Sequence, residues 1–181
     1  MTTAILGIYI TKGRIKDEVS RLGIELTKDY HDKNPVLVGV LKGSFIFLAD
    51  LIRELDFPLE VSFIALSSYK GMHSGAITQV YKESFERYKN RHIIIVEDII
   101  DTGRTIQHLI DSMAYYNPLS VKVCTLLDKP SKRIVIIKPD YTGFTVEDKW
   151  VVGYGLDFNE HYRNMRDIFV LHENPNRRII R

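Results

Sequence analysis

Continuous apolar runs alternate along this chain with segments in which apolar residues recur every three or four positions. The runs are rich in branched aliphatic residues and lack polar alternation, a pattern typical of strands in a parallel sheet covered on both faces. They predict strands at residues 36–41, 59–66, 93–96 and 121–127, with a shorter strand at 150–153.

The periodic segments predict helices between these strands. One helix is expected over residues 13–30, a second from Ser44, which would cap it, and a third from about Thr105. The residues expected to face the core are Ile15, Val19, Leu22 and Leu26 in the first helix, Phe45, Leu48, Ala49 and Ile52 in the second, and Ile106, Leu109, Ile110 and Met113 in the third. Strand, loop and helix alternate, which predicts an α/β fold with a mostly parallel sheet and right-handed crossovers.

Composition narrows the class of protein. The 181 residues are 45% hydrophobic and 27% charged, which suits a single domain over residues 1–181. A net charge of +2 gives no overall attraction to nucleic acid. Cys124, the one cysteine, lies in an apolar run and is expected in the core, as suits a reducing cytoplasm. No run is long enough to span a bilayer, and no export leader is expected.

The most informative segment runs from the strand at residues 93–96 through Glu97, Asp98 and Asp101 into a turn that opens the third helix. Unpaired N–H groups and the helix dipole favour a phosphate at such a turn. Acids beside a phosphate site indicate a ligand with hydroxyls or a metal-bound pyrophosphate. A Rossmann-like nucleotide turn is the alternative, although neither GxGxxG nor GxxxxGK[ST] occurs.

Residues 96–105 closely resemble the phosphoribosyl pyrophosphate signature of type I phosphoribosyltransferases, and the resemblance extends over about 36–169. It is nearest to the members that act on hypoxanthine and guanine. The resemblance implies a mostly parallel central sheet flanked by helices, a small hood formed partly by about 129–165, and a flexible lid loop over about 68–87. The implied reaction moves the 5-phosphoribosyl group to a 6-oxopurine in purine salvage, releasing pyrophosphate and giving IMP or GMP.

The resemblance also implies a set of site residues. Those expected to bind phosphoribosyl pyrophosphate are Lys42, Gly43, Ser68, Tyr69, Glu97, Asp98, Asp101, Thr102, Gly103, Arg104, Thr105 and Arg163. The peptide before the lysine is often a non-prolyl cis bond in this family. Mg²⁺ would be held by Glu97, Asp98 and Asp157, since carboxylate oxygens are hard ligands. Taken singly, Lys42 could be a solvated turn residue, and Asp157 and Arg163 could form a surface pair.

The purine would be bound by Lys129, Trp150 and Val151. Lys129 would donate to the oxygen at position 6, Trp150 would stack on the base, and the carbonyl of Val151 would meet its other edge. Asp101 is the expected catalytic residue, managing the proton at N7. The alternatives for these positions are a surface lysine in a Pro-containing turn and a core tryptophan.

Two other functions remain open at the level of sequence. An RNA-binding transcription attenuator of the pyrimidine operon resembles phosphoribosyltransferases but usually lacks an acid at the position of Asp101. An interaction domain that has lost catalysis is disfavoured because every expected charged position is filled. The six histidines show neither HExxH nor HxH spacing, so no zinc site is expected. The resemblance implies a homodimer or homotetramer, and the basic tail, Arg177, Arg178 and Arg181, is expected to be solvated or used in subunit contacts.

Overall fold

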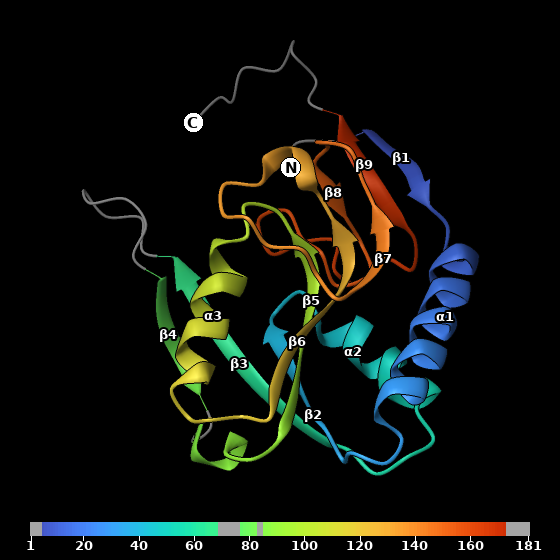
Figure 1. Cartoon of the computed structure of the whole chain (residues 1–181). Helices are drawn as coiled ribbons and strands as arrows, with labels where there is room; N and C mark the ends of the chain where they lie inside the picture. Colours follow the sequence, from blue (N-terminus) through green and yellow to red (C-terminus); the bar gives the residue numbers. More distant parts are fainter. Residues whose placement is uncertain (1–4, 69–76, 83–84, 173–181) are drawn as a thin grey trace.

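The computed structural model describes residues 5–68, 77–82 and 85–172. Two sheets and three α-helices form its framework (Figure 1). The helices are α1 (Lys12–Tyr30), α2 (Phe45–Leu51) and α3 (Arg104–Ala114). Three 3-10 helices are η1 (Ile52–Glu54), η2 (Phe85–Tyr88) and η3 (Pro130–Lys132). The strands are β1 (Ile5–Ile10), β2 (Val36–Leu41), β3 (Glu60–Ser68), β4 (Ile77–Lys82), β5 (His92–Ile100), β6 (Ser120–Asp128), β7 (Tyr141–Thr145), β8 (Val151–Val152) and β9 (Ile168–His172).

The central sheet has the strand order β4-β3-β2-β5-β6-β7. Its pairs from β3 to β7 are parallel, and β4 runs antiparallel at the edge. Side chains of β5 alternate between the faces: Ile94 and Val96 join the core that contains α1 and α2, whereas Ile93 and Ile95 join the core beneath α3. Burial on both faces explains why these strands carry continuous aliphatic runs. The predicted α/β fold with helices on both faces is confirmed.

The first helix follows its predicted stripe. Ile15, Val19, Leu22 and Leu26 are all buried, and α1 begins one residue before the predicted start. Thr11 supplies the cap, because its side chain accepts a hydrogen bond from the Arg14 amide.

The prediction for the second helix was wrong in two respects. The hydroxyl of Ser44 donates to the Val40 carbonyl at 2.7 Å and makes no capping bond. Phe45 is 44% exposed, and the buried residues are Phe47, Leu48 and Leu51. With only seven residues, α2 is oriented by its packing against α1 and the sheet, and the stripe at 47, 48 and 51 satisfies helical spacing as well as the predicted one.

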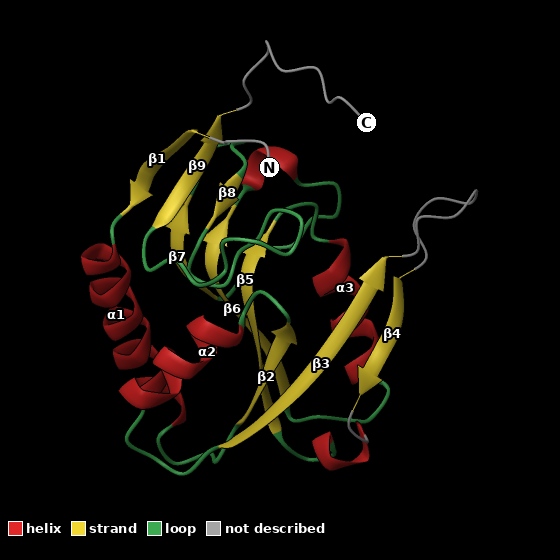
Figure 2. Ribbon diagram, turned by 180° about the vertical axis from the view of Figure 1, so that it is seen from behind, coloured by secondary structure: helices red, strands yellow, loops and turns green. Residues whose placement is uncertain are grey.

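A second, small sheet was not predicted from the sequence. It has the order β1-β9-β8 and joins both ends of the described chain. Figures 1 and 2 show it beyond the C-terminal ends of β5 and β6. Strand β7 was also missed. Within residues 68–87, the expected lid loop, the structure describes a strand, β4, that pairs antiparallel with β3. Residues 69–76 and 83–84 of the expected lid lie outside the described residues.

Cys124 is fully buried in the core, as predicted. Burial raises the pKa of its thiol far above the ordinary value. Such a thiol is a structural residue with no nucleophilic character near neutral pH. Across the described ranges, no helix is both long and apolar enough to cross a membrane.

Candidate active site

The predicted site residues follow three adjacent parallel strands. Strand β5 lies between β2 and β6, with Gly39 opposite Val96 and Ile100 opposite Asp128. Since parallel strands end at the same edge, the loops after β2, β5 and β6 meet there. This brings together the segments that begin with Lys42, Glu97 and Lys129.

The turn after β2 approaches the acids very closely. The Leu41–Lys42 peptide is cis and not prolyl, as is often the case in the family that the sequence resembles. A Cβ atom added to Gly43 would lie 1.7 Å from Oδ2 of Asp98. Position 43 therefore has room for hydrogen only, and its backbone packs directly on the carboxylate.

A charged cluster closes this side of the site. Arg163 pairs with Oδ1 of Asp157 at 2.8 Å and with Glu160 at 3.3 Å, and Glu160 also accepts from Lys42 at 3.2 Å. Asp157 and Arg163 thus do form a pair, but a partly buried one, with side chains 30% and 20% exposed. Sequence reasoning missed Glu160. Its carboxylate bridges two cations that were expected to bind pyrophosphate.

The paired acids after β5 have perturbed titration. Burial raises the pKa of Glu97 well above its ordinary value, and the charge of Asp98 adds to this rise. Burial likewise raises the pKa of Asp98 to about 6, against two backbone hydrogen bonds and the charge of Arg163, which lower it, while Asp157 raises it. Oε2 of Glu97 is buried without a hydrogen-bond partner within the described structure. Within the described residues, Oε2 of Glu97 therefore has no compensating partner, and the backbone hydrogen bonds and the charge of Arg163 do not offset the cost of burying Asp98.

The structure does not gather Glu97, Asp98 and Asp157 into a protein-only metal cage. Within residues 5–68, 77–82 and 85–172, no three acidic, histidine or cysteine side chains converge in that way. Asp157 is instead engaged by Arg163 and by the Glu160 amide. Mg²⁺ commonly keeps several waters and is held by one or two carboxylates together with substrate phosphates. The unpartnered Oε2 of Glu97 and the raised pKa of Asp98 fit that kind of binding.

The raised pKa of Asp98 makes a testable prediction for the metal-free protein. A group with a raised native pKa binds a proton in the folded state that the unfolded state has released. Its contribution to stability is therefore complete below about pH 4 and is lost as the pH rises through about 6. Between pH 5 and 7.5, the free energy of unfolding should fall by about 1.4 kcal/mol more in the wild type than in Asp98→Asn. Urea unfolding in EDTA measures this, and equal pH dependence in both proteins would contradict it.

The loop after β5 forms the predicted turn into α3. Gly103 is the residue before the helix, with φ of +83°, a left-handed conformation that glycine adopts without a Cβ clash. Its carbonyl accepts from the Gln107 amide at 3.0 Å, and the Thr102 hydroxyl accepts from Arg104 N at 3.4 Å. Asp101 is exposed immediately before this turn. Thr105 lies in the first turn of α3, so residues 101–105 surround a helix N-terminus as expected.

The predicted purine residues are also neighbours. Lys129 is 6% exposed, and its ammonium donates to the Lys149 carbonyl at 3.0 Å, beside Asp148 at 3.9 Å. Trp150 is 69% exposed, and Val151 is buried in β8. The surface-lysine alternative and the core-tryptophan alternative are therefore both wrong.

Other parts of the prediction fare differently. Ser68 ends β3, but its side chain is not described, and Tyr69 lies outside the described residues, as do Arg177, Arg178 and Arg181 of the tail. Sequence reasoning missed Asp128 and Arg133, which flank the turn after β6. Two further charged residues, Lys129 and Lys132, lie in that turn, and nothing in the local pattern distinguishes Arg133 from Lys132.

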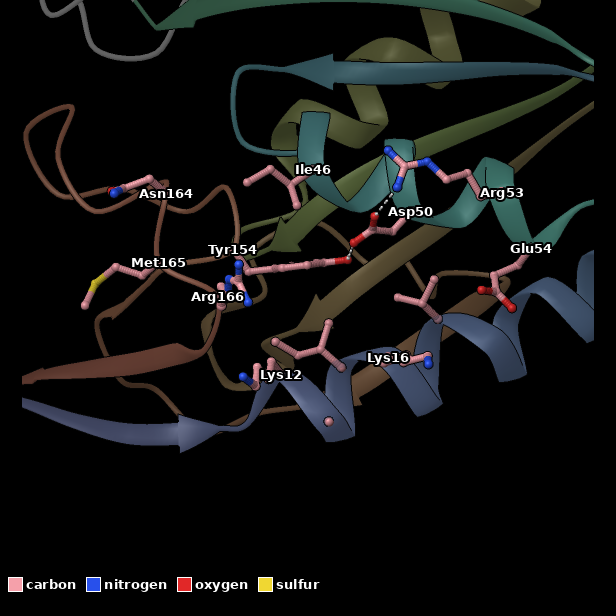
Figure 3. Close-up of a pocket in the computed structure, with 13 residues that line it drawn as sticks. Lys12, Lys16, Ile46, Asp50, Arg53, Glu54, Tyr154, Asn164, Met165 and Arg166 are labelled. Carbon is pink, nitrogen blue, oxygen red and sulfur yellow. Dashed lines mark hydrogen bonds and ion pairs between the residues drawn. The ribbon is translucent and has the colours of Figure 1, made fainter.

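A cavity of about 590 Å³ lies elsewhere, between α1, α2 and the loop at residues 164–166 (Figure 3). None of the predicted site residues lines it. Tyr154 extends into it and donates a hydrogen bond to Asp50 at 2.7 Å. This contact secures the base of the loop that carries Asp157 and Arg163, because Tyr154 and Gly155 donate their amides to the carbonyls of Met165 and Arg163.

Comparison with known proteins assigns this arrangement to a family. A family model described as the phosphoribosyl transferase domain matches residues 9–159. The chain belongs to the phosphoribosyltransferase family.

Its relatives include hypoxanthine-guanine phosphoribosyltransferases. That of Streptococcus pneumoniae is 45% identical over 167 residues, covering 92% of this chain and 93% of the relative. That of Lactococcus lactis is 45% identical over 169 residues, covering 93% and 92%. A crystal structure of a hypoxanthine-guanine phosphoribosyltransferase from Bacillus anthracis matches with a TM-score of 0.87 at 34% identity, covering 94% of this chain and 99% of that one. The resemblance seen in the sequence is confirmed for the fold and for this branch of the family, and the RNA-binding alternative is not favoured.

Proposed function

We propose that this protein transfers the 5-phosphoribosyl group of phosphoribosyl pyrophosphate to hypoxanthine or guanine, releasing pyrophosphate and giving IMP or GMP. The observation that carries the proposal is the meeting of two features at one sheet edge. The turn at residues 101–105, named the phosphate turn below, follows the acids at the end of β5. The buried Lys129, which has N–H donors not used by the described part of the protein, follows β6. The protein is accordingly a pentosyltransferase of purine salvage, and its substrates are small molecules.

The donor would be held along the edge formed by β2 and β5. Glu97 and Asp98 would bind the ribose hydroxyls, and residues 101–105 would bind the 5-phosphate through backbone amides and hydroxyls. Lys42 and Arg163 would bind pyrophosphate after Glu160 releases them. The roles assigned here to Gly103 and Arg104 need only their backbone amides.

We propose Mg²⁺ as the cofactor, held through Glu97 and Asp98 with Asp157 nearby. When bound, Mg²⁺ would neutralise charge on the pyrophosphate that leaves. The support is the buried Oε2 of Glu97, which has no hydrogen-bond partner within the described structure, and the raised pKa values of Glu97 and Asp98.

Catalysis by the chain itself would be mainly electrostatic. As the bond from C1 of the ribose to pyrophosphate breaks, positive charge develops on the sugar and negative charge on the leaving group. Lys42 and Arg163 would stabilise the leaving group. Asp101, exposed at the mouth of the phosphate turn, would take the proton at N7 of the purine as general base and return it in the reverse direction.

Lys129 would select the 6-oxo group. An ammonium carries three donors and no acceptor. One donor is used at the Lys149 carbonyl, which leaves others for the purine oxygen. Adenine presents an amino group at that position, which cannot accept from the ammonium, so a buried donor would be left unsatisfied and adenine would be rejected. Exposed Trp150 would stack on the base, and the Val151 carbonyl would meet its other edge.

Lys129→Ala should therefore lower the ratio of kcat/KM for hypoxanthine to kcat/KM for adenine. A hydrogen bond to a charged group is worth about 1.5–3 kcal/mol, so kcat/KM for hypoxanthine should fall by on the order of 10- to 100-fold while that for adenine stays the same or rises. Lys132→Ala is the matched control, because Lys132 lies in the same turn but pairs with Asp148 at 2.8 Å and is 49% exposed. An unchanged hypoxanthine-to-adenine ratio in Lys129→Ala would rule out this role.

The proposed function is tested by steady-state assays with phosphoribosyl pyrophosphate, Mg²⁺ and single bases. Turnover is expected with hypoxanthine, guanine or both, and not with adenine or uracil. Turnover with uracil alone, or with no base, would contradict the proposal. Xanthine is included because the residues on this edge do not fix discrimination at position 2.

We also propose that the protein acts as a homodimer or homotetramer in the cytoplasm. Phe45, directly after the turn at residues 42–44, is 44% exposed, and Phe158, in the loop at 157–163, is 45% exposed. A subunit contact would cover these aromatic side chains. The buried free thiol of Cys124 suits a reducing compartment. Light scattering coupled to gel filtration measures the oligomer, and a monomer at micromolar concentration would contradict the first part.

A further inference from the structure

Arg133 reaches from the turn after β6 back to the phosphate turn after β5. Its Nη1 donates to the Asp101 carbonyl at 2.8 Å, and its Nη2 pairs with Oδ1 of Asp128. The side chains of this ion pair are 12% and 14% exposed. A pair that is shielded from water in this way differs from an exposed surface pair, which contributes little.

The backbone after Arg133 adds to the same connection. The amides of Ile134 and Val135 both donate to the Thr102 carbonyl, at 3.0 and 3.1 Å. A Cβ atom at Gly103 would lie 3.1 Å from Cδ of Arg133 and 3.1 Å from the Val135 carbonyl. The segment at 133–135 therefore packs against the whole of the turn at 101–103, with hydrogen bonds to its first two carbonyls.

The guanidinium is suited to this position by its shape. Its planar fork presents separate N–H groups, so one side chain can serve a carboxylate and a carbonyl that lie in different directions. Asp128 is the last residue of β6, and the next residue, Lys129, donates its amide to the Ile100 carbonyl at 3.0 Å. Arg133 thus joins the end of β6, directly before Lys129, to the backbone of Asp101.

We propose that Arg133 is a positioning residue for phosphoribosyl transfer, holding the backbone of Asp101 and Thr102 in register with Lys129. The inference rests on the role proposed above for Asp101. The hydrogen bonds from residues 133–135 fix the carbonyls of Asp101 and Thr102. This would keep the amides of the turn directed toward the 5-phosphate, and the Asp101 carboxylate directed toward N7 of the base. Misplacement of a reacting group by about 1 Å can cost on the order of 100-fold in rate.

Arg133→Gln should lower kcat by about 10- to 100-fold and raise KM for phosphoribosyl pyrophosphate, while KM for the purine changes by less than about threefold. A merely structural role would lower the amount of folded enzyme and leave the kcat of the folded fraction and both KM values unchanged. Arg133→Lys retains the charge but not the fork, so it should keep the pairing with Asp128 and still lose most of the kcat.

Arg91 offers a matched control. It also bridges a carboxylate and a carbonyl, pairing with Glu60 at 2.7 Å and donating to Asn34 at 2.8 Å, but it precedes β5, at the opposite end of the sheet. Arg91→Gln should therefore lower the unfolding temperature about as much as Arg133→Gln and leave kcat and both KM values unchanged.

Asp101→Asn, measured in parallel, separates the two proposals. If Asp101→Asn keeps its turnover, the role of Asp101 fails whatever Arg133 does. If Asp101→Asn loses turnover while Arg133→Gln behaves like Arg91→Gln, the positioning role of Arg133 is overturned and that of Asp101 stands. Should Arg133→Gln not fold, Arg133→Lys carries the test, and wild-type kcat in that variant would overturn the inference.

Discussion

Replacing Asp101 with asparagine should lower kcat by about 10²- to 10⁴-fold, the range that general acid-base catalysis contributes. Asparagine has nearly the same shape but cannot accept and return a proton at N7. The backbone amides of the phosphate turn and the charged groups around Lys42 and Arg163 are untouched by this change. KM for phosphoribosyl pyrophosphate should therefore stay within a few-fold of the wild-type value.

Steady-state kinetics with hypoxanthine in both directions measure this effect. Asp111→Asn is the control, because Asp111 is an exposed acid of α3 whose carboxylate accepts a hydrogen bond from the Gln107 side chain. It should be neutral in kcat. A kcat for Asp101→Asn within about fivefold of the wild type would show that the proton is managed elsewhere.

The fold could be predicted where local pattern and burial agree. Strand β5 contains four fully buried aliphatic residues in succession, and α1 keeps its apolar residues on one stripe over 19 residues. Such elements are specified by their own sequence. The buried face of α2 is not specified by its own seven residues, because it depends on how the helix packs against α1 and the sheet. The small sheet could not be predicted because β1 and β9 pair across nearly the whole chain, as Ile5 opposite His172 shows.

The candidate site divides in the same way. Residues in one segment, such as Glu97, Asp98 and Asp101, are recognisable from their order. Glu160 and Arg133 are not, because their importance lies in contacts with Lys42 and with the Asp101 carbonyl that no local spacing encodes. The burial of Lys129 could not be predicted from the local pattern either, since its neighbours in the sequence form a polar turn.

The cations of the site are paired before substrate arrives, whereas its two adjacent acids are not. Glu160 pairs with both Lys42 and Arg163, while no ion pair to Glu97 or Asp98 is formed within the described residues. A magnesium-bound pyrophosphate would reverse both conditions, since its anionic end would displace Glu160 and its cation would compensate the acids. If Mg²⁺ and pyrophosphate bind as proposed, these side chains would favour binding of the two together over binding of either alone.

Gly43→Ala should have a comparably large effect on the donor side. The added methyl group would lie 1.7 Å from Oδ2 and 2.4 Å from Cγ of Asp98, far inside any allowed contact. Either the turn at Lys42 and Gly43 or the Asp98 carboxylate has to move, and both belong to the proposed site for phosphoribosyl pyrophosphate. A displacement of this size should lower kcat/KM for phosphoribosyl pyrophosphate by on the order of 100-fold.

Gly13→Ala distinguishes this effect from a general cost of replacing glycine. A Cβ atom at Gly13, in the first turn of α1, would meet only Oγ1 of Thr11, at 3.9 Å. That variant should keep full activity and gain slightly in stability, because alanine favours helix over glycine by about 1 kcal/mol. If Gly43→Ala kept wild-type kcat/KM for phosphoribosyl pyrophosphate, the close approach of position 43 to Asp98 would have no part in donor binding. If instead it lost donor affinity while its unfolding temperature stayed close to that of the wild type, the contact serves the reaction and not the fold.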